Sequence, residues 1–226
     1  MRPGLLLAIL PVLTVAVGAW FGFDVSRAGK LSGFVWLAAP SFIFAAIGVW
    51  LTVKKKTARA LFKPQWGDLS FGFFVALAMF GLSYAGARLV IGAHKAIWIS
   101  RLYDQAGDTS FMRDHLVLVA LGIISLASAE EIVWRSLVTD ALALRFGKRA
   151  WIVAAVLYAA AHLPTVWKLS DDMMGKNPLV PFAALGAGLA FGAVVRRTGR
   201  LAPAIVAHAI FDWTVIVMFR LYGNSV

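Results

Sequence analysis

The chain has 226 residues, of which 61% are hydrophobic and only 15% are charged. Soluble domains contain about 45–50% apolar and about 25% charged residues, so this composition excludes an ordinary water-soluble domain. Cysteine is absent, which excludes disulfides, thiolate metal ligands and a cysteine nucleophile.

Seven apolar stretches, each near the roughly 20 residues that cross a bilayer as a helix, predict an all-α, polytopic transmembrane bundle of about seven spans. They cover residues 4–22, 31–53, 69–93, 115–138, 150–167, 179–195 and 201–220. The first has an apolar run like that of a signal peptide, but we expect it to be retained as a span. The whole chain, residues 1–226, is expected to form a single membrane domain.

Basic residues predict the orientation of the bundle and account for the net charge of +11 without nucleic acid. They gather in the alternate loops 54–68, 139–149 and 196–200: Lys54, Lys55, Lys56, Arg59, Lys63, Arg145, Lys148, Arg149, Arg196, Arg197 and Arg200. Lys and Arg concentrate in cytoplasmic loops of membrane proteins, so these loops and the N-terminus are expected in the cytoplasm.

Segment 94–114 is too polar to span and predicts an external loop with a short interfacial helix. Its expected membrane anchors are Trp98, Leu102 and Phe111. His94 and His115 fall in or beside this loop, and we leave them out of the candidate site. The sixth span repeats small residues at four-residue spacing, which favours close helix packing in a membrane; they are Ala184, Gly188 and Gly192.

The fourth span contains Glu130, Glu131 and Arg135, although a charge near the bilayer centre costs about 2.5–3.5 kcal/mol even on the lenient insertion scale. Glu131 and Arg135 stand four residues apart on one helical face and can form an ion pair. Glu130 points about 100° away from that face and has no local partner. A structural ion pair therefore explains only half of the motif, and Glu130 is the candidate proton acceptor.

Two later spans repeat the four-residue spacing with other ionisable side chains. Tyr158 and His162 lie in the fifth span, and His208 and Asp212 lie in the seventh. Counted from the expected cytoplasmic ends, Glu130, His162 and His208 lie about 15, 18 and 11 Å deep at 1.5 Å per residue. Neighbouring helices can therefore bring these three groups to one level of the membrane.

Other arrangements for hydrolysis within a membrane are missing from the sequence. It has no H-E-x-x-H zinc motif, no G-x-S-x-G-like turn around Ser125 or Ser128, and no G-x-G-D element. The remaining set is a carboxylate with two histidines and an aspartate, which suits activation of a water molecule.

Three motifs together resemble one known family. Residues 130–135 read E-E-x-x-x-R, Tyr158 to His162 resembles F-x-x-x-H, and His208 to Asp212 resembles H-x-x-x-N/D. Their order and spacing resemble the CAAX protease and bacteriocin-processing (CPBP, or Abi) family, which includes the type II CAAX prenyl endopeptidases. The resemblance covers residues 115–220, and residues 1–114 carry no motif of the family.

The resemblance implies a glutamic-type intramembrane endopeptidase. By family analogy, Glu130 and His162 hold and deprotonate the attacking water, and His208 and Asp212 stabilise the oxyanion. Glu131 and Arg135 look like the supporting pair. Two positions depart from the family: Tyr158 replaces the commoner Phe, and Asp212 replaces the Asn of the prenyl endopeptidases. An ionised aspartate cannot donate to an oxyanion, so Asp212 either orients His208 or is protonated.

Several alternatives stay open at this stage. Glu130, His162 and His208 have the types of a His₂Glu zinc site, although we prefer a metal-free mechanism without a cofactor. A proton-coupled transporter also uses buried carboxylates, but no symmetric halves are evident. A non-enzymatic bacteriocin-immunity protein is the third alternative. The expected substrate is a membrane-associated sorting signal, leader or lipidated tail, and the expected location is the bacterial inner membrane.

Overall fold

The computed structural model describes residues 3–86 and 95–222, and these residues form a bundle of helices. Among them no strand is formed, and the only ladder contact is an isolated bridge between Asp171 and Gly175. Six segments are long and apolar enough to cross a membrane. The predicted polytopic helical bundle is therefore confirmed, and the number of spans stays a prediction.

The first half of the described chain forms α1 (Pro3–Gly22), η1 (Val25–Arg27), α2 (Leu31–Lys54), α3 (Ala58–Phe62), α4 (Asp68–Gly86), α5 (Lys95–Gln105) and α6 (Thr109–Asp114). The second half forms α7 (Leu116–Glu131), the π-helix η4 (Ile132–Val138), α8 (Thr139–Phe146), η5 (Gly147–Arg149), α9 (Ala150–Ala161), α10 (Thr165–Lys168), α11 (Leu179–Thr198), α12 (Ala202–Asp212), the π-helix η6 (Trp213–Met218) and α13 (Phe219–Tyr222). One apolar segment of 53 residues, Leu116–Lys168, contains two of the predicted spans.

One predicted span ends earlier in the structure than in the sequence pattern, and another is described only in part. The fifth stretch was expected to continue to residue 167, but α9 ends at Ala161 and a turn follows. Pro164 explains this end, since a proline disfavours the helical conformation of the residue before it. Part of the stretch 69–93 lies outside the described residues, because α4 is described only to Gly86.

The polar segment 94–114 forms two short helices, α5 and α6, where one was expected. Asp108 separates them, because its carboxylate accepts a hydrogen bond from the Ser110 backbone N–H and caps α6. Trp98 and Leu102 are half-buried and Phe111 is exposed. His94 lies outside the described residues.

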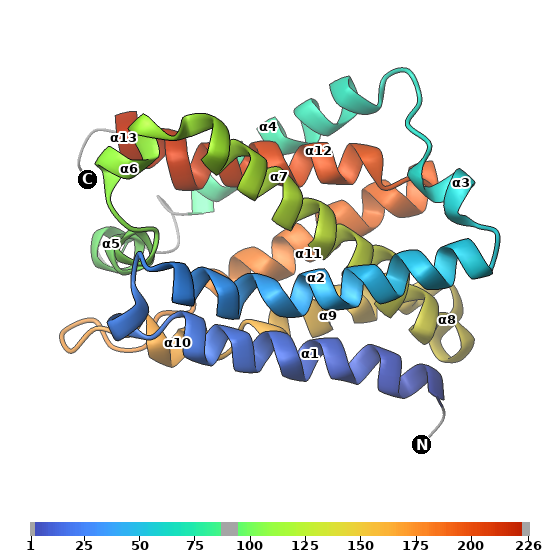
Figure 1. Ribbon diagram of the computed structural model, residues 1–226, viewed down its shortest axis with the longest axis horizontal. Coiled ribbons are helices and arrows are strands. Elements are labelled where there is room, and N and C mark those ends of the chain that lie inside the picture. The colour runs from blue at the N-terminus through green and yellow to red at the C-terminus, as the bar shows by residue number, and fades with distance from the viewer. Residues whose placement is uncertain (1–2, 87–94, 223–226) are drawn as a thin grey trace.

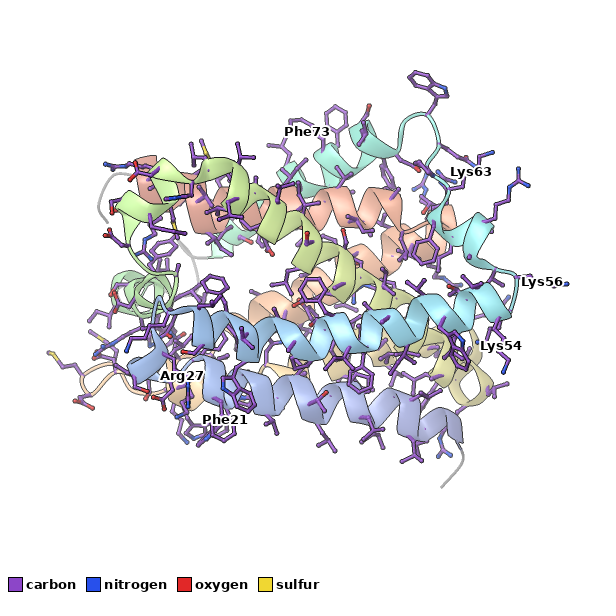
Figure 2. The ribbon with its side chains drawn as sticks, in the orientation of Figure 1. Phe21, Arg27, Lys54, Lys56, Lys63 and Phe73 are labelled. Atoms are coloured by element: carbon purple, nitrogen blue, oxygen red, sulfur yellow. The ribbon has the colours of Figure 1, made fainter. Side chains whose placement is uncertain are left out.

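Figure 1 shows the long helices running along a common axis, with α3 and α8 at the end where α1 begins. The opposite end carries α5, α6 and α13. In Figure 2, Lys54, Lys56 and Lys63 lie at the first end and Arg27 lies at the other. The basic loops therefore share one end of the bundle, as the charge pattern predicted, and the assignment of that end to the cytoplasm stays a prediction.

The predicted close packing of small residues is found between α9 and α11. A Cβ atom on Gly188 would lie 3.0 Å from the Cβ of Ala155, and one on Gly192 would lie 3.0 Å from the ring of Trp151. Gly72 of α4 has the same role against Pro203 of α12, where an added Cβ would come within 2.7 Å of a carbonyl oxygen. These approaches pack α11 against α9, which carries Tyr158, and α4 against α12, which carries His208 and Asp212.

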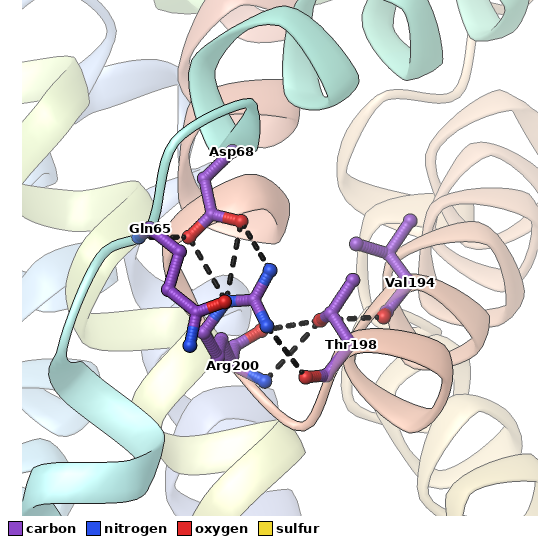
Figure 3. Close-up of polar contacts among 5 residues, drawn as sticks. All are labelled: Gln65, Asp68, Val194, Thr198 and Arg200. Atoms are coloured by element: carbon purple, nitrogen blue, oxygen red, sulfur yellow. Dashed lines mark hydrogen bonds and ion pairs between the residues drawn. The ribbon is translucent and has the colours of Figure 1, made fainter.

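An ion pair fixes the beginning of α12 at the basic end, and Figure 3 shows its contacts. Arg200 donates through Nη2 to the Asp68 carboxylate at 2.6 Å and through Nη1 to the Thr198 carbonyl at 3.0 Å. Only 4% of the Asp68 side chain is exposed. This pair, called here the Asp68–Arg200 clamp, joins the beginning of α4 to the residues just before α12. A hydrogen bond from Leu201 N–H to the Leu61 carbonyl joins the same end of α12 to α3.

At the opposite end, α5 is tied to the loop that precedes α11. Arg101 donates to Asp171 at 2.6 Å, and the Asn177 side-chain amide donates to the Trp98 carbonyl at 3.0 Å. The hydrogen bonds from Arg101 hold the pKa of Asp171 below its usual range, and the pKa of Arg101 is raised in turn. This end of the bundle is therefore closed by polar contacts.

Candidate active site

The two adjacent glutamates lie at the end of α7, directly before a change in helix geometry. Glu131 is the last residue of α7, and the π-helix η4 begins at Ile132. Asp212 likewise ends α12 directly before the π-helix η6. π-Helical turns often occur at functional sites, since an inserted residue turns the side chains before it relative to those after it. Two such turns here each follow an acidic residue of the predicted site.

Glu131 and Arg135 form the predicted ion pair across the start of η4. Arg135 Nε lies 3.1 Å from Glu131 Oε2, and Arg135 Nη2 donates to Glu131 Oε1 at 3.2 Å. The exposed fractions of these side chains are 0% for Glu131 and 3% for Arg135. Neither group can therefore meet a substrate directly, which agrees with a supporting role.

His208 connects this pair to the rest of the site, a contact that the sequence did not predict. Its Nδ1 lies 3.0 Å from Glu131 Oε1. Its Nε2 lies 3.4 Å from Asp212 Oδ2 and 3.9 Å from Glu130 Oε2. A neutral imidazole donates from one nitrogen only, whereas both nitrogens of His208 face carboxylates. This arrangement favours the doubly protonated, positively charged ring.

Glu130, which has no local partner on its own helix, has one on α9. The Tyr158 hydroxyl on α9 donates to Glu130 Oε2 at 2.8 Å. The reason is the rotation of α9, which turns the only aromatic hydroxyl of the motifs toward α7. The backbone carbonyl of Tyr158 lies 2.8 Å from His162 Nδ1, and His162 forms the C-terminal cap of α9. Tyr158 therefore joins Glu130 and His162, the two groups expected to bind water.

Exposure separates the carboxylates into two classes. The exposed fractions of the Glu130 and Asp212 side chains are 14% and 29%, against 0% for Glu131. Since a reacting group must meet water and substrate, Glu130 and Asp212 are the accessible carboxylates. Glu131 can act only through Arg135 and His208.

Aromatic side chains enclose the network, and one of them was missed in the sequence. Phe191 of α11 stacks on His208 with ring centroids 4.8 Å apart, and the Arg135 guanidinium lies 5.8 Å from the centre of the same ring. Trp134 packs on Tyr158 at 5.1 Å. Phe191 lies one residue before Gly192 in the small-residue stripe, and an aromatic residue in that stripe is the only signal that pointed to it.

Glu130, His162 and His208 are the residues whose types suit a His₂Glu zinc site. Within the described ranges, no group of three or more His, Asp or Glu side chains is placed to hold a metal ion.

Comparison with known proteins identifies the same part of the chain. Residues 112–214 match the family model for "Type II CAAX prenyl endopeptidase Rce1-like", which spans every residue of the candidate site. No curated protein and no solved structure matches the chain. The resemblance predicted from the three motifs is thus confirmed. The family consists of CAAX prenyl endopeptidases, which are intramembrane proteases, and the predicted enzyme class is confirmed with it.

Proposed function

We propose that this Rce1-like chain hydrolyses a peptide bond in the prenylated tail of a membrane-associated protein. The observation that carries the proposal is the position of Glu130, a partly exposed carboxylate with Oε2 3.9 Å from His208 Nε2 in an apolar helix bundle. A carboxylate beside a cationic donor can both deprotonate water and stand close to the developing oxyanion. The family match supports the same class of reaction.

The reaction begins with a water molecule between Glu130 and His162. Glu130 accepts a proton from the water, and the resulting hydroxide forms a bond to the scissile carbonyl carbon. The carbonyl electron pair moves to oxygen, which becomes the oxyanion. When the intermediate collapses, the C–N bond breaks and Glu130 returns the proton to the leaving nitrogen. The products are a carboxylic acid and an amine, and transfer of the acid proton to the amine gives a carboxylate and an ammonium group.

His208 supplies the positive hydrogen-bond donor for the oxyanion. Glu131 at Nδ1 holds the ring, so that Nε2–H points to the side where Glu130 and Asp212 are exposed. Asp212 lies 3.4 Å from that nitrogen and acts by orienting the ring rather than by donating a hydrogen bond. Removing one donor of this kind costs about 10²–10³ in kcat in well-studied enzymes.

The test uses the full chain in proteoliposomes with a fluorogenic farnesylated peptide that ends in Cys-aliphatic-aliphatic-X. Glu130→Gln should reduce cleavage by at least about a hundredfold, because a general base contributes 10²–10⁴. Asp140→Asn is the matched control, since Asp140 is an exposed acidic residue paired with Lys55 at 3.3 Å, away from the site. Full cleavage by the Glu130 variant would overturn the proposal.

The same assay decides the substrate class. A farnesylated peptide that is cleaved at least tenfold faster than its unprenylated counterpart supports a lipidated tail, and the reverse preference points to a leader or sorting signal. The proposed location of the protein is the bacterial inner membrane.

A zinc-dependent version of the reaction is the second candidate, because Glu130, His162 and His208 have suitable residue types. In the metal-free version that we prefer, His208 carries a proton on each ring nitrogen, and each N–H faces a carboxylate. Metal analysis of the purified protein, with activity measured before and after chelation, separates the two. Stoichiometric zinc together with loss of activity on chelation would replace the metal-free mechanism.

A further inference from the structure

We propose that Tyr158 is a positioning residue that fixes the orientation of the Glu130 carboxylate, an inference that rests on the proposed role of Glu130 as the base. The F-x-x-x-H pattern that residues 158–162 resemble has no hydroxyl at its first position, where this chain has Tyr158. The claim concerns the hydroxyl alone and not the aromatic ring.

The contacts of Glu130 divide its two oxygens. The Tyr158 hydroxyl donates to Oε2 at 2.8 Å, and His208 Nε2 faces the same oxygen at 3.9 Å. No side chain or backbone group within the described part of the chain donates to Oε1. Since a carboxylate is planar and has two acceptor oxygens, fixing Oε2 also fixes the direction of Oε1. Oε1 is therefore the oxygen left for the water proton.

The ring of Tyr158 is held on several sides, so its hydroxyl has a defined position. Only 5% of the residue is exposed. The Trp134 ring lies 5.1 Å away, the His162 ring meets it edge-on at 4.7 Å, and the Arg135 guanidinium lies 5.4 Å from the ring centre. A donor held in this way orders the carboxylate without a large further loss of side-chain entropy.

Tyr158 also contacts His162, through its backbone. The carbonyl oxygen of Tyr158 lies 2.8 Å from His162 Nδ1. A carbonyl can only accept, so Nδ1 carries the proton and Nε2 of a neutral ring has the lone pair. This contact persists when Tyr158 is replaced by Phe. The substitution therefore removes the link to Glu130 and keeps the link to His162.

Tyr158→Phe leaves the Glu130 carboxylate with one hydrogen-bond donor fewer in an apolar surrounding. The carboxylate can then rotate about its side-chain bonds, so Oε1 is directed less often at the water. We expect kcat to fall by about tenfold or more, because a displaced catalytic group lowers the rate of the chemical step. KM should change little, since substrate binding does not depend on the hydroxyl.

Tyr103→Phe is the matched control, since the Tyr103 hydroxyl donates to the Val215 carbonyl at 2.9 Å outside the site. Both variants lose one partly or fully buried hydroxyl contact, so both are expected to lower the melting temperature. Only Tyr158→Phe should lower kcat at an unchanged KM. A kcat of Tyr158→Phe equal to that of the wild type would overturn the proposal, because a purely structural role predicts that result.

A measurement without turnover keeps this inference separate from the proposed function. The infrared carboxylate band of Glu130 is isolated by subtracting the spectrum of Glu130→Gln, and its position and width are compared between the wild type and Tyr158→Phe. A shifted or broader band in Tyr158→Phe supports the positioning role even if Glu130→Gln retains activity and the proposed function fails. An unchanged band, with Glu130→Gln inactive, would remove the positioning role and leave the proposed function intact.

Discussion

Replacing Glu131 by Gln removes a negative charge from a side chain that is fully buried between Arg135 and His208. The Arg135 side chain is only 3% exposed, and its guanidinium then loses its ion-pair partner. Removal of one partner of a buried ion pair costs about 3–5 kcal/mol of folding stability. At about 2–4 °C per kcal/mol for a chain of this length, the apparent melting temperature should fall by about 6–20 °C.

Glu130→Gln is the matched comparison, because the two residues are adjacent in the sequence. The Glu130 side chain is 14% exposed, and its hydrogen bond comes from the neutral Tyr158 hydroxyl. The amide oxygen of Gln can accept the same hydrogen bond. The expected loss of stability is therefore below about 1 kcal/mol, or less than about 4 °C. Glu130→Gln should abolish cleavage with an intact fold, whereas Glu131→Gln should reduce both stability and cleavage.

The measurement is thermal unfolding in detergent, followed by fluorescence, on both variants and on the double variant Glu131→Gln/Arg135→Met. The double variant should recover a large part of the lost stability, since it leaves no unpaired buried charge. Equal melting temperatures for Glu130→Gln and Glu131→Gln would refute the division into a reacting and a supporting carboxylate.

Three further predictions concern the helix contacts and the two ends of the bundle. Gly188→Val should lower the melting temperature by an amount equivalent to about 1–3 kcal/mol, because the added side chain overpacks the contact with α9. Gly186→Val is the control and should leave the melting temperature unchanged, because no atom lies within 4 Å of its added Cβ. Arg200→Met breaks the Asp68–Arg200 clamp and should lower both melting temperature and cleavage, and an unchanged melting temperature would contradict a structural clamp. The lowered pKa of Asp171, caused by hydrogen bonds from Arg101, means that this contact stabilises the fold above about pH 4 and is lost as the pH falls through the folded-state value. Asp171→Asn should therefore be less stable than the wild type at pH 7, with the difference shrinking only in acid.

Local spacing explains why a large part of the fold and half of the site could be predicted from the sequence. Apolar stretches of span length fix the helices, and small residues at four-residue spacing fix the α9–α11 contact through Gly188 and Gly192. Glu131 and Arg135 pair as expected because both lie on one helical turn, where spacing alone determines distance. Pro164 could in addition have predicted the end of α9.

Contacts between helices could not be predicted in the same way. Spacing gives the angle between two side chains on one helix but not the rotation of a neighbouring helix about its own axis. The hydrogen bond from Tyr158 to Glu130 joins residues 28 positions apart, and the contact of His208 with Glu131 joins residues 77 positions apart. For this reason spacing identified no local partner for Glu130 and assigned Glu131 only to Arg135.

These two contacts between helices explain why adjacent glutamates are needed at one place. Successive residues of a helix point about 100° apart, so Glu130 and Glu131 face different neighbours. Glu131 fixes Nδ1 of His208 and thereby directs Nε2 toward the accessible side, where Glu130 stands 3.9 Å away. A single carboxylate could not hold the far side of the imidazole and also stand before its near side. The pair places one carboxylate behind the histidine and one in front of it.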